Sequence, residues 1–225
     1  MIRLKNICKH YKVNNTIALN NIDLAIDQGE LLAIRGKSGA GKSTLINIIG
    51  FLDNSSSGDY YFQNEKIEQS AYKKQLKLRS KNIGFVVQNF ALIPDHTIFY
   101  NISLPLMYQG YSKQQIESRV HEVAKRMNID TLLNKLPQHI SGGESQRAAI
   151  ARALVNKPDI ILADEPTASL DEKNEEIIIE YFKELNREGI TIIIVTHDHS
   201  VANQCNRVID LSDGKITSDL ELGSR

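Results

Sequence analysis

One segment limits the fold of this chain more than any other: an apolar strand that runs directly into a glycine-rich loop and then into a helix. The run Leu31-Leu32-Ala33-Ile34 is apolar at every position, which is the pattern of a strand buried on both faces of a sheet. The loop from Gly36 to Gly41 follows at once, and a helix is predicted from Lys42 to about Ile49. Strands covered on both faces occur in parallel sheets flanked by helices, so this segment predicts an α/β fold.

Further strands support the same fold class. Apolar runs predict buried strands at Ile83 to Val87, Ile160 to Ala163 and Thr191 to Thr196, and segments with helical periodicity separate them. Parallel strands need such crossover helices. Short strands are also predicted at Arg3 to Ile7 and Ala18 to Ile26, before the glycine-rich loop. The order is that of a doubly wound sheet.

The stretch from about Asn89 to Pro158 lacks strand signals and carries helical ones instead. Ser112-Lys113-Gln114-Gln115 has the capping-box pattern that begins a helix. The apolar residues that follow share one helix face, and they are Ile116, Val120, Val123 and Met127. We therefore expect a helical lobe inserted into the α/β core.

Length and charge fit one domain that recognises its partners locally. A chain of 225 residues with 41% hydrophobic content can bury one sizeable core. Its 27 basic and 27 acidic residues balance, so the chain has no global positive field of the kind that holds a protein on nucleic acid. We expect no nucleic-acid partner.

Cysteine usage and hydropathy are typical of a cytoplasmic protein. Cys8 and Cys205 lie far apart in the chain and have no metal-ligand or CxxC spacing, so both are interpreted as packing residues. The longest apolar stretches, such as Ile190 to Val195, are far shorter than the ~18 residues that a membrane helix needs. The N-terminus runs into strand-like sequence without the apolar core of a signal peptide. A cytoplasmic location is expected.

The glycine-rich loop has the residue pattern of a phosphate-binding P-loop. Residues 36 to 43 read Gly-Lys-Ser-Gly-Ala-Gly-Lys-Ser, a pattern in which backbone N–H groups wrap phosphates and Lys42 reaches the terminal ones. Ser43 would then be a ligand of Mg²⁺. The alternative is a plain glycine-rich turn between a strand and a helix, but such a turn needs neither the lysine nor the hydroxyl.

A second carboxylate for the metal is expected where another buried strand ends. The run from Ile160 to Ala163 is followed by Asp164 and Glu165. Asp164 is predicted to hold Mg²⁺ through water, and Glu165 to polarise the attacking water or accept its proton. A strand that merely ends in two acids is the alternative. Next to a P-loop, the pair predicts a site for hydrolysis.

The deciding segment is Ile140-Ser141-Gly142-Gly143-Glu144-Ser145-Gln146-Arg147, which precedes an alanine-rich helix. Ser141 and Glu144 have the spacing of a capping box, and the two glycines leave backbone N–H groups at the positive end of the helix open to an anion. A well-capped helix with no further role is the alternative, although a cap does not require two glycines. The segment resembles the signature of ATP-binding cassette (ABC) ATPases.

Other parts of that family's pattern occur in the same order. Gln88 follows a strand, Ala168-Ser169-Leu170-Asp171 follows Glu165, and His197 follows the strand that ends at Thr196. The resemblance implies that Gln88 couples the metal site to the helical lobe, that Asp171 lies on a dimer seam and that His197 contacts the γ-phosphate. Tyr11 resembles the aromatic residue that stacks on adenine, and it is alternatively a packed surface aromatic.

The resemblance therefore implies a set of functional residues, with ATP and Mg²⁺ as the bound groups. The expected catalytic residues are Glu165, His197 and Gln88, and the expected Mg²⁺ ligands are Ser43, Gln88 and Asp164. The expected nucleotide-binding residues are Tyr11, Gly36, Ser38, Gly39, Ala40, Gly41, Lys42, Ser43, Thr44, Ser141, Gly142, Gly143, Glu144 and Asp171. Glu144 stands where a glutamine is commoner, and Ser145 where several relatives carry a longer polar or charged side chain.

The resemblance also implies the architecture. It predicts a single ABC ATPase domain over residues 1–225: a P-loop NTPase core with a mainly parallel sheet, an N-terminal antiparallel β subdomain and an inserted α-helical subdomain. The core with its β subdomain would take residues 1–88 and 159–225. The helical subdomain with the signature would take about 89–158.

In this family the signature of one subunit closes over the ATP held by the P-loop of another. The resemblance thus implies a homodimer in the ATP-bound state and a separate transmembrane permease, with the chain peripheral on the cytoplasmic face of the membrane. Residues 38–53 and 83–97, followed by Leu104-Pro105-Leu106, look like the branch that exports macrolides, bacteriocins or antimicrobial peptides, or releases lipoproteins.

Other functions are also compatible with parts of this sequence. The same ATPase regulates a membrane protein without transport in the related cell-division pair, and the sequence does not separate that function from transport. A soluble ABC ATPase of DNA repair or translation is disfavoured because those proteins carry tandem cassettes or long coiled-coil insertions. A nucleotide-binding scaffold without catalysis is disfavoured because Lys42, Asp164, Glu165 and His197 are all present.

Overall fold

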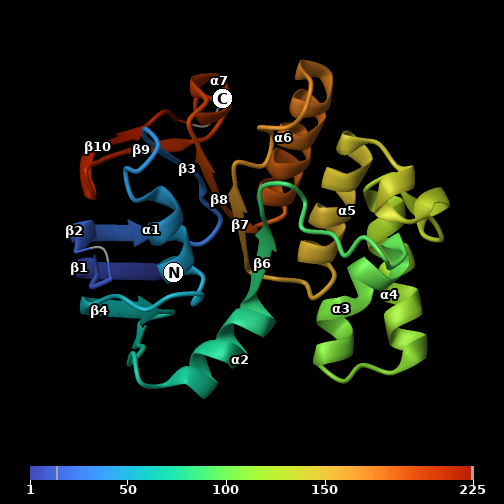
Figure 1. The fold of residues 1–225 in the computed structure, drawn as a ribbon, viewed down its shortest axis with the longest axis horizontal. Helices are drawn as coiled ribbons and strands as arrows, with labels where there is room; N and C mark the ends of the chain where they lie inside the picture. The colour runs from blue at the N-terminus through green and yellow to red at the C-terminus, as the bar shows by residue number, and fades with distance from the viewer. Residues whose placement is uncertain (14, 224–225) are drawn as a thin grey trace.

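The computed structural model describes residues 1–13 and 15–223, and its central feature is a six-stranded sheet in the order β10-β9-β3-β8-β7-β6. The strands are β3 (Leu31–Arg35), β6 (Ile83–Val86), β7 (Ile160–Asp164), β8 (Thr191–Thr196), β9 (Arg207–Ser212) and β10 (Lys215–Glu221). Neighbouring strands are parallel except β10, which pairs antiparallel with β9 at the edge (Figure 1). The predicted mainly parallel sheet is confirmed. The β9–β10 hairpin was not predicted.

The central strands β3, β7 and β8 are buried on both faces, which explains their uninterrupted apolar runs. In β3, Leu31 and Ala33 pack into one hydrophobic cluster, while Leu32 and Ile34 pack into the other. Residues of β7 and β8 alternate between the same two clusters. Successive side chains of a strand point to opposite faces, so a strand between two cores has no polar face.

One cluster lies under an antiparallel sheet of four strands in the order β2-β1-β4-β5. These strands are β1 (Ile2–Tyr11), β2 (Thr16–Ile26), β4 (Ser57–Phe62) and β5 (Glu65–Lys66). Helix α1 (Lys42–Ile49) contributes four buried apolar residues to the same cluster. The N-terminal antiparallel β subdomain is confirmed. Its first two strands extend past the predicted bounds because His10 pairs with Ile17 in a hairpin whose residues are largely exposed.

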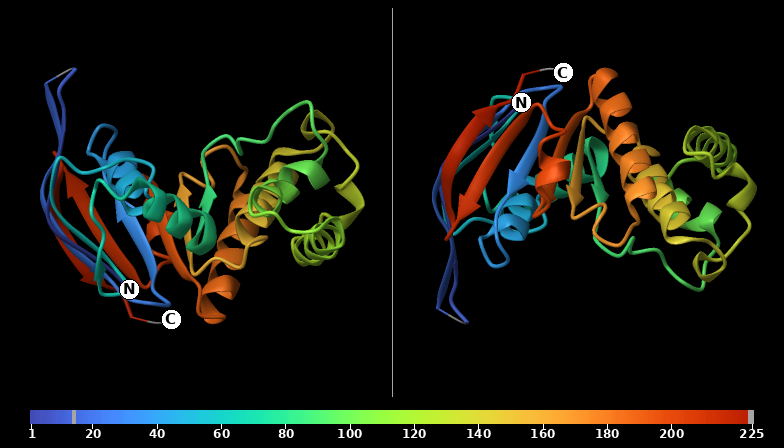
Figure 2. Two further views of the ribbon diagram at one scale, coloured as in Figure 1. Left: turned by 90° about the horizontal axis from the view of Figure 1, so that it is seen from below. Right: turned by 90° about the horizontal axis from the view of Figure 1, so that it is seen from above.

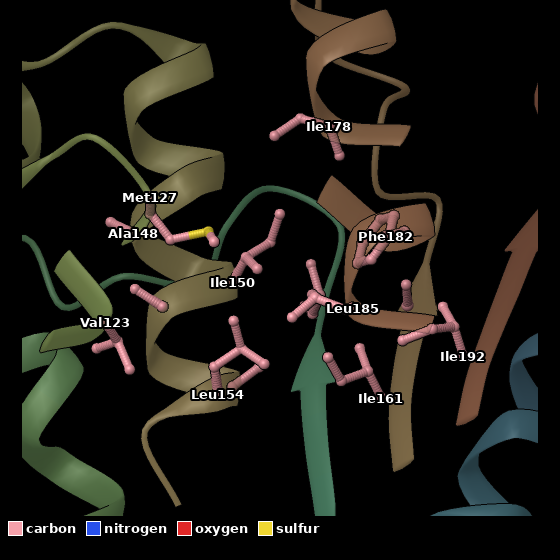
Figure 3. Packing of buried hydrophobic residues seen from close by; sticks show 14 of the residues in the cluster. Val123, Met127, Ala148, Ile150, Leu154, Ile161, Ile178, Phe182, Leu185 and Ile192 are labelled. Carbon is pink, nitrogen blue, oxygen red and sulfur yellow. The ribbon is translucent and has the colours of Figure 1, made fainter. Parts of the chain in front are cut away.

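Helices contribute to the cluster on the other face of the central sheet: α3 (Ile98–Tyr108), α4 (Lys113–Arg126), α5 (Gly142–Leu154), α6 (Glu172–Arg187) and α7 (His199–Ala202). Two short 3₁₀ turns, η1 (Asp130–Leu132) and η2 (Pro137–His139), lie between α4 and α5. Helix α2 (Tyr72–Asn82) instead packs Leu78 against the first cluster. Figure 3 shows Leu185 of α6 between Ile150 of α5 and Ile161 of β7, with Phe182 of α6 on the far side of Leu185 from Ile150. One apolar core therefore joins the sheet to the signature helix α5.

Residues 89–158 contain helices and no strand. Helix α4 begins at the predicted Ser112 capping box, and α5 begins at the predicted Ser141 capping box. Figures 1 and 2 place α3, α4 and α5 together at one end of the molecule, with the antiparallel sheet at the opposite end. The basic residues from Lys73 to Lys81 lie on α2, a mostly exposed helix. None of the helices in the described residues has the length and apolarity needed to span a membrane.

Phe182 is the largest of the buried side chains that α6 packs toward the sheet. It is 0% exposed, so Phe182→Ala should lower the free energy of unfolding by about 3–5 kcal/mol through lost burial and a residual cavity. Ile177 on the same helix is 36% exposed and serves as the matched control, because Ile177→Ala should cost far less. Urea unfolding followed by circular dichroism measures both. Equal losses in the two variants would contradict this packing.

Candidate nucleotide-binding site

A cavity of about 730 Å³ lies where the parallel strands end. The loops after β3, β6, β7 and β8 all reach this edge, which is where α/β sheets bind ligands. Its lining residues come from the P-loop, these strand ends and strand β2: Thr16, Ile17, Ala18, Lys37, Ser38, Gly39, Gly41, Lys42, Ser43, Thr44, Gln88, Asp164, Glu165 and His197. The fold thus brings together residues that lie more than 150 positions apart.

The P-loop is held in place by its own backbone and by Lys42. Gly41 has a φ of 102°, and a Cβ there would lie 2.4 Å from the carbonyl oxygen of Ala18. The Lys42 ammonium donates to the carbonyl oxygens of Gly36 at 2.8 Å and Lys37 at 3.1 Å. Helix α1 begins at Lys42, so its free N–H groups and positive dipole end face the loop. This arrangement suits an anion such as a phosphate.

Oxygen donors gather beside the loop. The Ser43 hydroxyl hydrogen-bonds to the Asp164 carboxylate at the end of β7. Burial raises the pKa of Asp164 above its ordinary value, the adjacent Glu165 raises it further, and Ser43 and Lys42 oppose the shift. Gln88 lines the same cavity. A hydroxyl, a carboxylate and an amide are the donor types that Mg²⁺ prefers when phosphates supply the remaining ligands, so these residues fit the ion.

Glu165 and His197 form a pair in the lining of the same cavity. Oε1 of Glu165 lies 2.8 Å from Nδ1 of His197. Glu165 has a φ of 47°, in the left-handed region, and its N–H donates to the Val195 carbonyl at 2.9 Å. The buried Thr196 hydroxyl donates to Oε2 at 3.4 Å. Such a backbone conformation persists only where its surroundings fix it, and here both strand ends do so.

The signature residues lie outside this cavity. Ser141, Gly142, Gly143 and Glu144 begin α5, and the Glu144 side chain accepts a hydrogen bond from the Ser141 N–H at 2.7 Å. That bond, and a second one with the Ser141 hydroxyl, hold the pKa of Glu144 below its ordinary value. None of the four lines the phosphate cavity. In a single chain, the P-loop and the signature belong to separate surfaces.

The two signature glycines differ in what surrounds them. A Cβ on Gly143 would lie 2.2 Å from Oδ1 of Asn174, whereas a Cβ on Gly142 has nothing closer than 3.8 Å. Asn174 in turn donates to Asp171, which caps α6, through its N–H at 2.9 Å and its Nδ2 at 2.8 Å. Gly143 is thus required by packing within the chain, and the exposed Gly142 is open to an external group.

Tyr11 lies outside the cavity lining as well. Its hydroxyl donates to Oδ2 of Asp53 at 2.9 Å, and the Lys9 ammonium sits 4.8 Å from the ring centroid. Lys9 and Asp53 pair at 2.6 Å. The ring is therefore fixed at the end of β1 and keeps 38% of its surface exposed. Gly36 and Ala40 belong to the P-loop without lining the cavity.

Sequence reasoning missed side chains that hold these groups in place. Thr196 fixes the Glu165 carboxylate, and Nε2 of the buried Gln146 on α5 donates to the carbonyl oxygen of Pro166, next to Glu165. The signal for Thr196 was a hydroxyl residue directly before His197 at a strand end. Gln146 carries no comparable local signal, because its partner lies 20 residues further along the chain.

The doubly wound sheet with a P-loop, a Ser43–Asp164 cluster and a Glu165–His197 pair defines a P-loop nucleotide-binding protein. The family follows from comparison with known proteins. A family model described as ABC transporter matches residues 19–168, and the chain belongs to this family as an ATP-binding cassette. It is 43% identical over 218 residues to the ABC transporter ATP-binding protein YknY of Bacillus subtilis, covering 96% of this chain and 95% of that protein.

Two further relatives are similar to nearly the whole of this chain. The macrolide export ATP-binding/permease protein MacB of Campylobacter jejuni is 41% identical over 219 residues, which cover 97% of this chain and 34% of MacB. The ATP-binding cassette MJ0796, solved as a dimer in a post-hydrolysis state bound to ADP and Pi, is 41% identical. The structural match covers 100% of this chain and 100% of that chain, with a TM-score of 0.91.

The contrast between the two glycines predicts a difference in stability. Both Gly143→Ala and Gly142→Ala gain helix propensity, so the difference between them isolates the contact with Asn174. Gly143→Ala should be less stable than Gly142→Ala by about 1–3 kcal/mol. Chemical denaturation measures this gap, and Asn174→Ala should close it. Equal stability of the two alanine variants would contradict the packing described.

Proposed function

We propose that this chain is the ATP-hydrolysing subunit of an ABC exporter, and that residues 1–225 work as one ATPase domain that closes as a homodimer over ATP. The observation that carries the proposal is the Glu165–His197 pair, with 2.8 Å between Oε1 and Nδ1, in the same cavity as Lys42 and Asp164. A carboxylate that faces a phosphate cradle can activate water, and the P-loop alone cannot.

In the proposed mechanism separate residues bind the phosphates, bind the metal ion and activate the water. The P-loop N–H groups and Lys42 would hold the phosphates, and Ser43, Asp164 and Gln88 would hold Mg²⁺, which when bound would neutralise charge on the phosphate oxygens. The Glu165 carboxylate takes a proton from the attacking water. Because an ionised carboxylate only accepts hydrogen bonds, Nδ1 of His197 donates in their contact, and this contact fixes the orientation of the imidazole ring at the cavity.

The separation of the signature from the P-loop supports the homodimer. Gly142 is exposed and its surroundings are open, and Ser141 leaves N–H groups at the start of α5 available to an anion. A second copy of the chain would place this surface over the nucleotide. Asp171 would then lie near the seam, and Tyr11 would stack on adenine with the ring face opposite Lys9. The dimeric MJ0796 structures are consistent with this arrangement.

An apolar groove of about 690 Å³ between α2, β6 and α3 supports a membrane partner. Its residues include Leu76 and Tyr108, which are 41% and 88% exposed. We assign this groove to a cytoplasmic segment of a separate permease, which would hold the chain on the inner face of the membrane. MacB carries a permease in its own chain, as its name states. The cargo proposed from this branch is a macrolide, a bacteriocin or other antimicrobial peptide, or a lipoprotein.

Replacement of the proposed base tests the mechanism. Glu165→Gln should keep Mg-ATP binding, lose turnover by roughly 10²- to 10⁴-fold and convert from monomer to dimer only when Mg-ATP is present. Size-exclusion chromatography with light scattering measures the conversion. Adding Gly142→Asp should abolish the dimer by placing a carboxylate against the γ-phosphate. Normal hydrolysis by Glu165→Gln, or dimerisation without nucleotide, would disprove the assignment.

Disruption of the groove tests the partner. Leu76→Glu and Tyr108→Glu should prevent co-purification with the permease and leave the Mg-ATPase activity of the isolated chain unchanged, since neither residue lines the phosphate cavity. Tyr72→Glu is the control, because Tyr72 is 66% exposed on the same helix as Leu76 but outside the groove. If the groove variants still retain the permease, the partner binds a different surface. If the permease acts without moving cargo, the regulatory function is favoured.

A further inference from the structure

The segment directly after Gln88 has an unusual backbone. Asn89, Phe90 and Ala91 have φ values of 61°, 63° and 46° in succession, and none of them is glycine. The Ala91 N–H donates to the Asn89 carbonyl at 2.6 Å, which closes a tight three-residue turn around Phe90. Left-handed conformations are disfavoured for residues with a Cβ, and a turn of this kind with a positive central φ is strained. This strained segment (residues 89–91) therefore needs external support.

Arg152 of helix α5 supplies that support. Its Nη1 donates to the Ala91 carbonyl at 2.6 Å, and its Nη2 donates to the Phe90 carbonyl at 2.8 Å. The two hydrogen bonds use the planar fork of the guanidinium. They bind two successive peptide groups whose carbonyl directions are set by the left-handed φ values. A relaxed segment would not present both oxygens to the fork.

Arg152 is not an ordinary solvated surface cation, because its guanidinium is partly buried. Burial lowers the pKa of its guanidinium below the ordinary value, and no carboxylate in the described parts of the chain lies within ion-pair distance of it. A partly buried cation is costly unless hydrogen bonds compensate for lost water. The carbonyl oxygens of Phe90 and Ala91 provide this compensation. The same contact thus satisfies the cation and fixes the backbone.

The strained segment links two regions described above. At its N-terminal side lies Gln88, which lines the phosphate cavity. Phe90 reaches toward the signature, since its ring lies 3.8 Å from where a Cβ of Gly142 would stand. Arg152, near the C-terminal end of α5, lines the apolar groove. A displacement at either end of α5 would therefore alter the backbone conformation next to Gln88.

We propose that Arg152 is a positioning residue for Gln88: its guanidinium holds residues 89–91 in the strained turn and so keeps the Gln88 carboxamide at the phosphate cavity. The inference rests on the proposed function, in which Gln88 is a ligand of Mg²⁺. Loss of the fork releases the turn and withdraws one oxygen donor from the metal. The expected defect is a higher Mg²⁺ requirement together with a lower kcat, rather than a general loss of structure.

Arg152→Lys keeps the charge but loses the fork. It should lower kcat for ATP and raise the Mg²⁺ concentration at half-maximal activity, each by roughly 10- to 100-fold, as is typical when an outer partner of a metal ligand is lost. Ala91→Gly in the Arg152→Lys chain should restore a large part of both values, because glycine adopts positive φ without a Cβ penalty. A residue needed only for stability would not be rescued in this way.

Lys157 provides a matched control. It is exposed and has a φ of 53°, close to the 46° of Ala91, but it lies after α5 and away from Gln88. Lys157→Gly in the Arg152→Lys chain should leave the Mg²⁺ requirement unrestored. Should Arg152→Lys fail to fold, Ala91→Val tests the proposal with Arg152 intact. A β-branched residue disfavours positive φ, so Ala91→Val should reproduce the Mg²⁺ defect and Lys157→Val should not.

A spectroscopic readout separates this inference from the proposed function. The chain has no tryptophan, so Phe90→Trp reports on the strained segment alone. Acrylamide quenching should rise when Arg152→Lys is added and fall again with Ala91→Gly. Unchanged quenching, or an unchanged Mg²⁺ requirement in spite of increased quenching, would overturn the positioning role. A wild-type chain without any ATPase activity would instead overturn the proposed function, and the quenching result would still show whether Arg152 holds the turn.

Discussion

The structure depends on burial of one parallel sheet on both faces. A strand with apolar residues on both sides has no place for a functional polar group along its length, so polar chemistry is confined to the strand ends. The parallel register pairs Arg35 with Thr196 and Asp164 with Val195, so β3, β7 and β8 end side by side. The P-loop, Glu165 and His197 meet for this reason, although each is distant from the others in the chain.

The elements and residues that could be predicted from the sequence are those whose cause is local. The buried strands, helix α1 and both capping boxes follow from apolar runs and from hydrogen bonds between residues three positions apart. Gly36 to Ser43 and the two acids at the end of β7 were identified because their spacing carries the chemistry. Long-range contacts were not predictable in this way. Thr196 at the end of β8 contacts Glu165 beside the neighbouring strand β7, and Gln146 contacts Pro166 from a helix in the lobe.

Prediction from the sequence has a second limit where, in the proposed homodimer, the site includes residues of a second chain. The signature pattern predicts a helix N-terminus open to an anion, and the structure has that helix end exposed and apart from the P-loop cavity. Packing explains Gly143 through Asn174, but among the residues that the structure describes no close contact requires a glycine at 142. In the proposed homodimer the open space at Gly142 would receive the nucleotide, because a small residue lets a phosphate approach the backbone. The nucleotide would then contribute to association as well as serving as substrate.

Helix α5 connects these parts physically. Its first turn carries the signature, and Gln146 in its second turn contacts the loop beside Glu165. Arg152 near its C-terminal end donates hydrogen bonds to the turn beside Gln88. Apolar residues such as Ile150 and Leu154 anchor the same helix to α6 and the sheet (Figure 3). A rigid helix that contacts both loops cannot shift without changing the environment of each. In the proposed transporter, movement of the helical lobe against the sheet would therefore reach the water-activating residue and the metal ligand together, through one element.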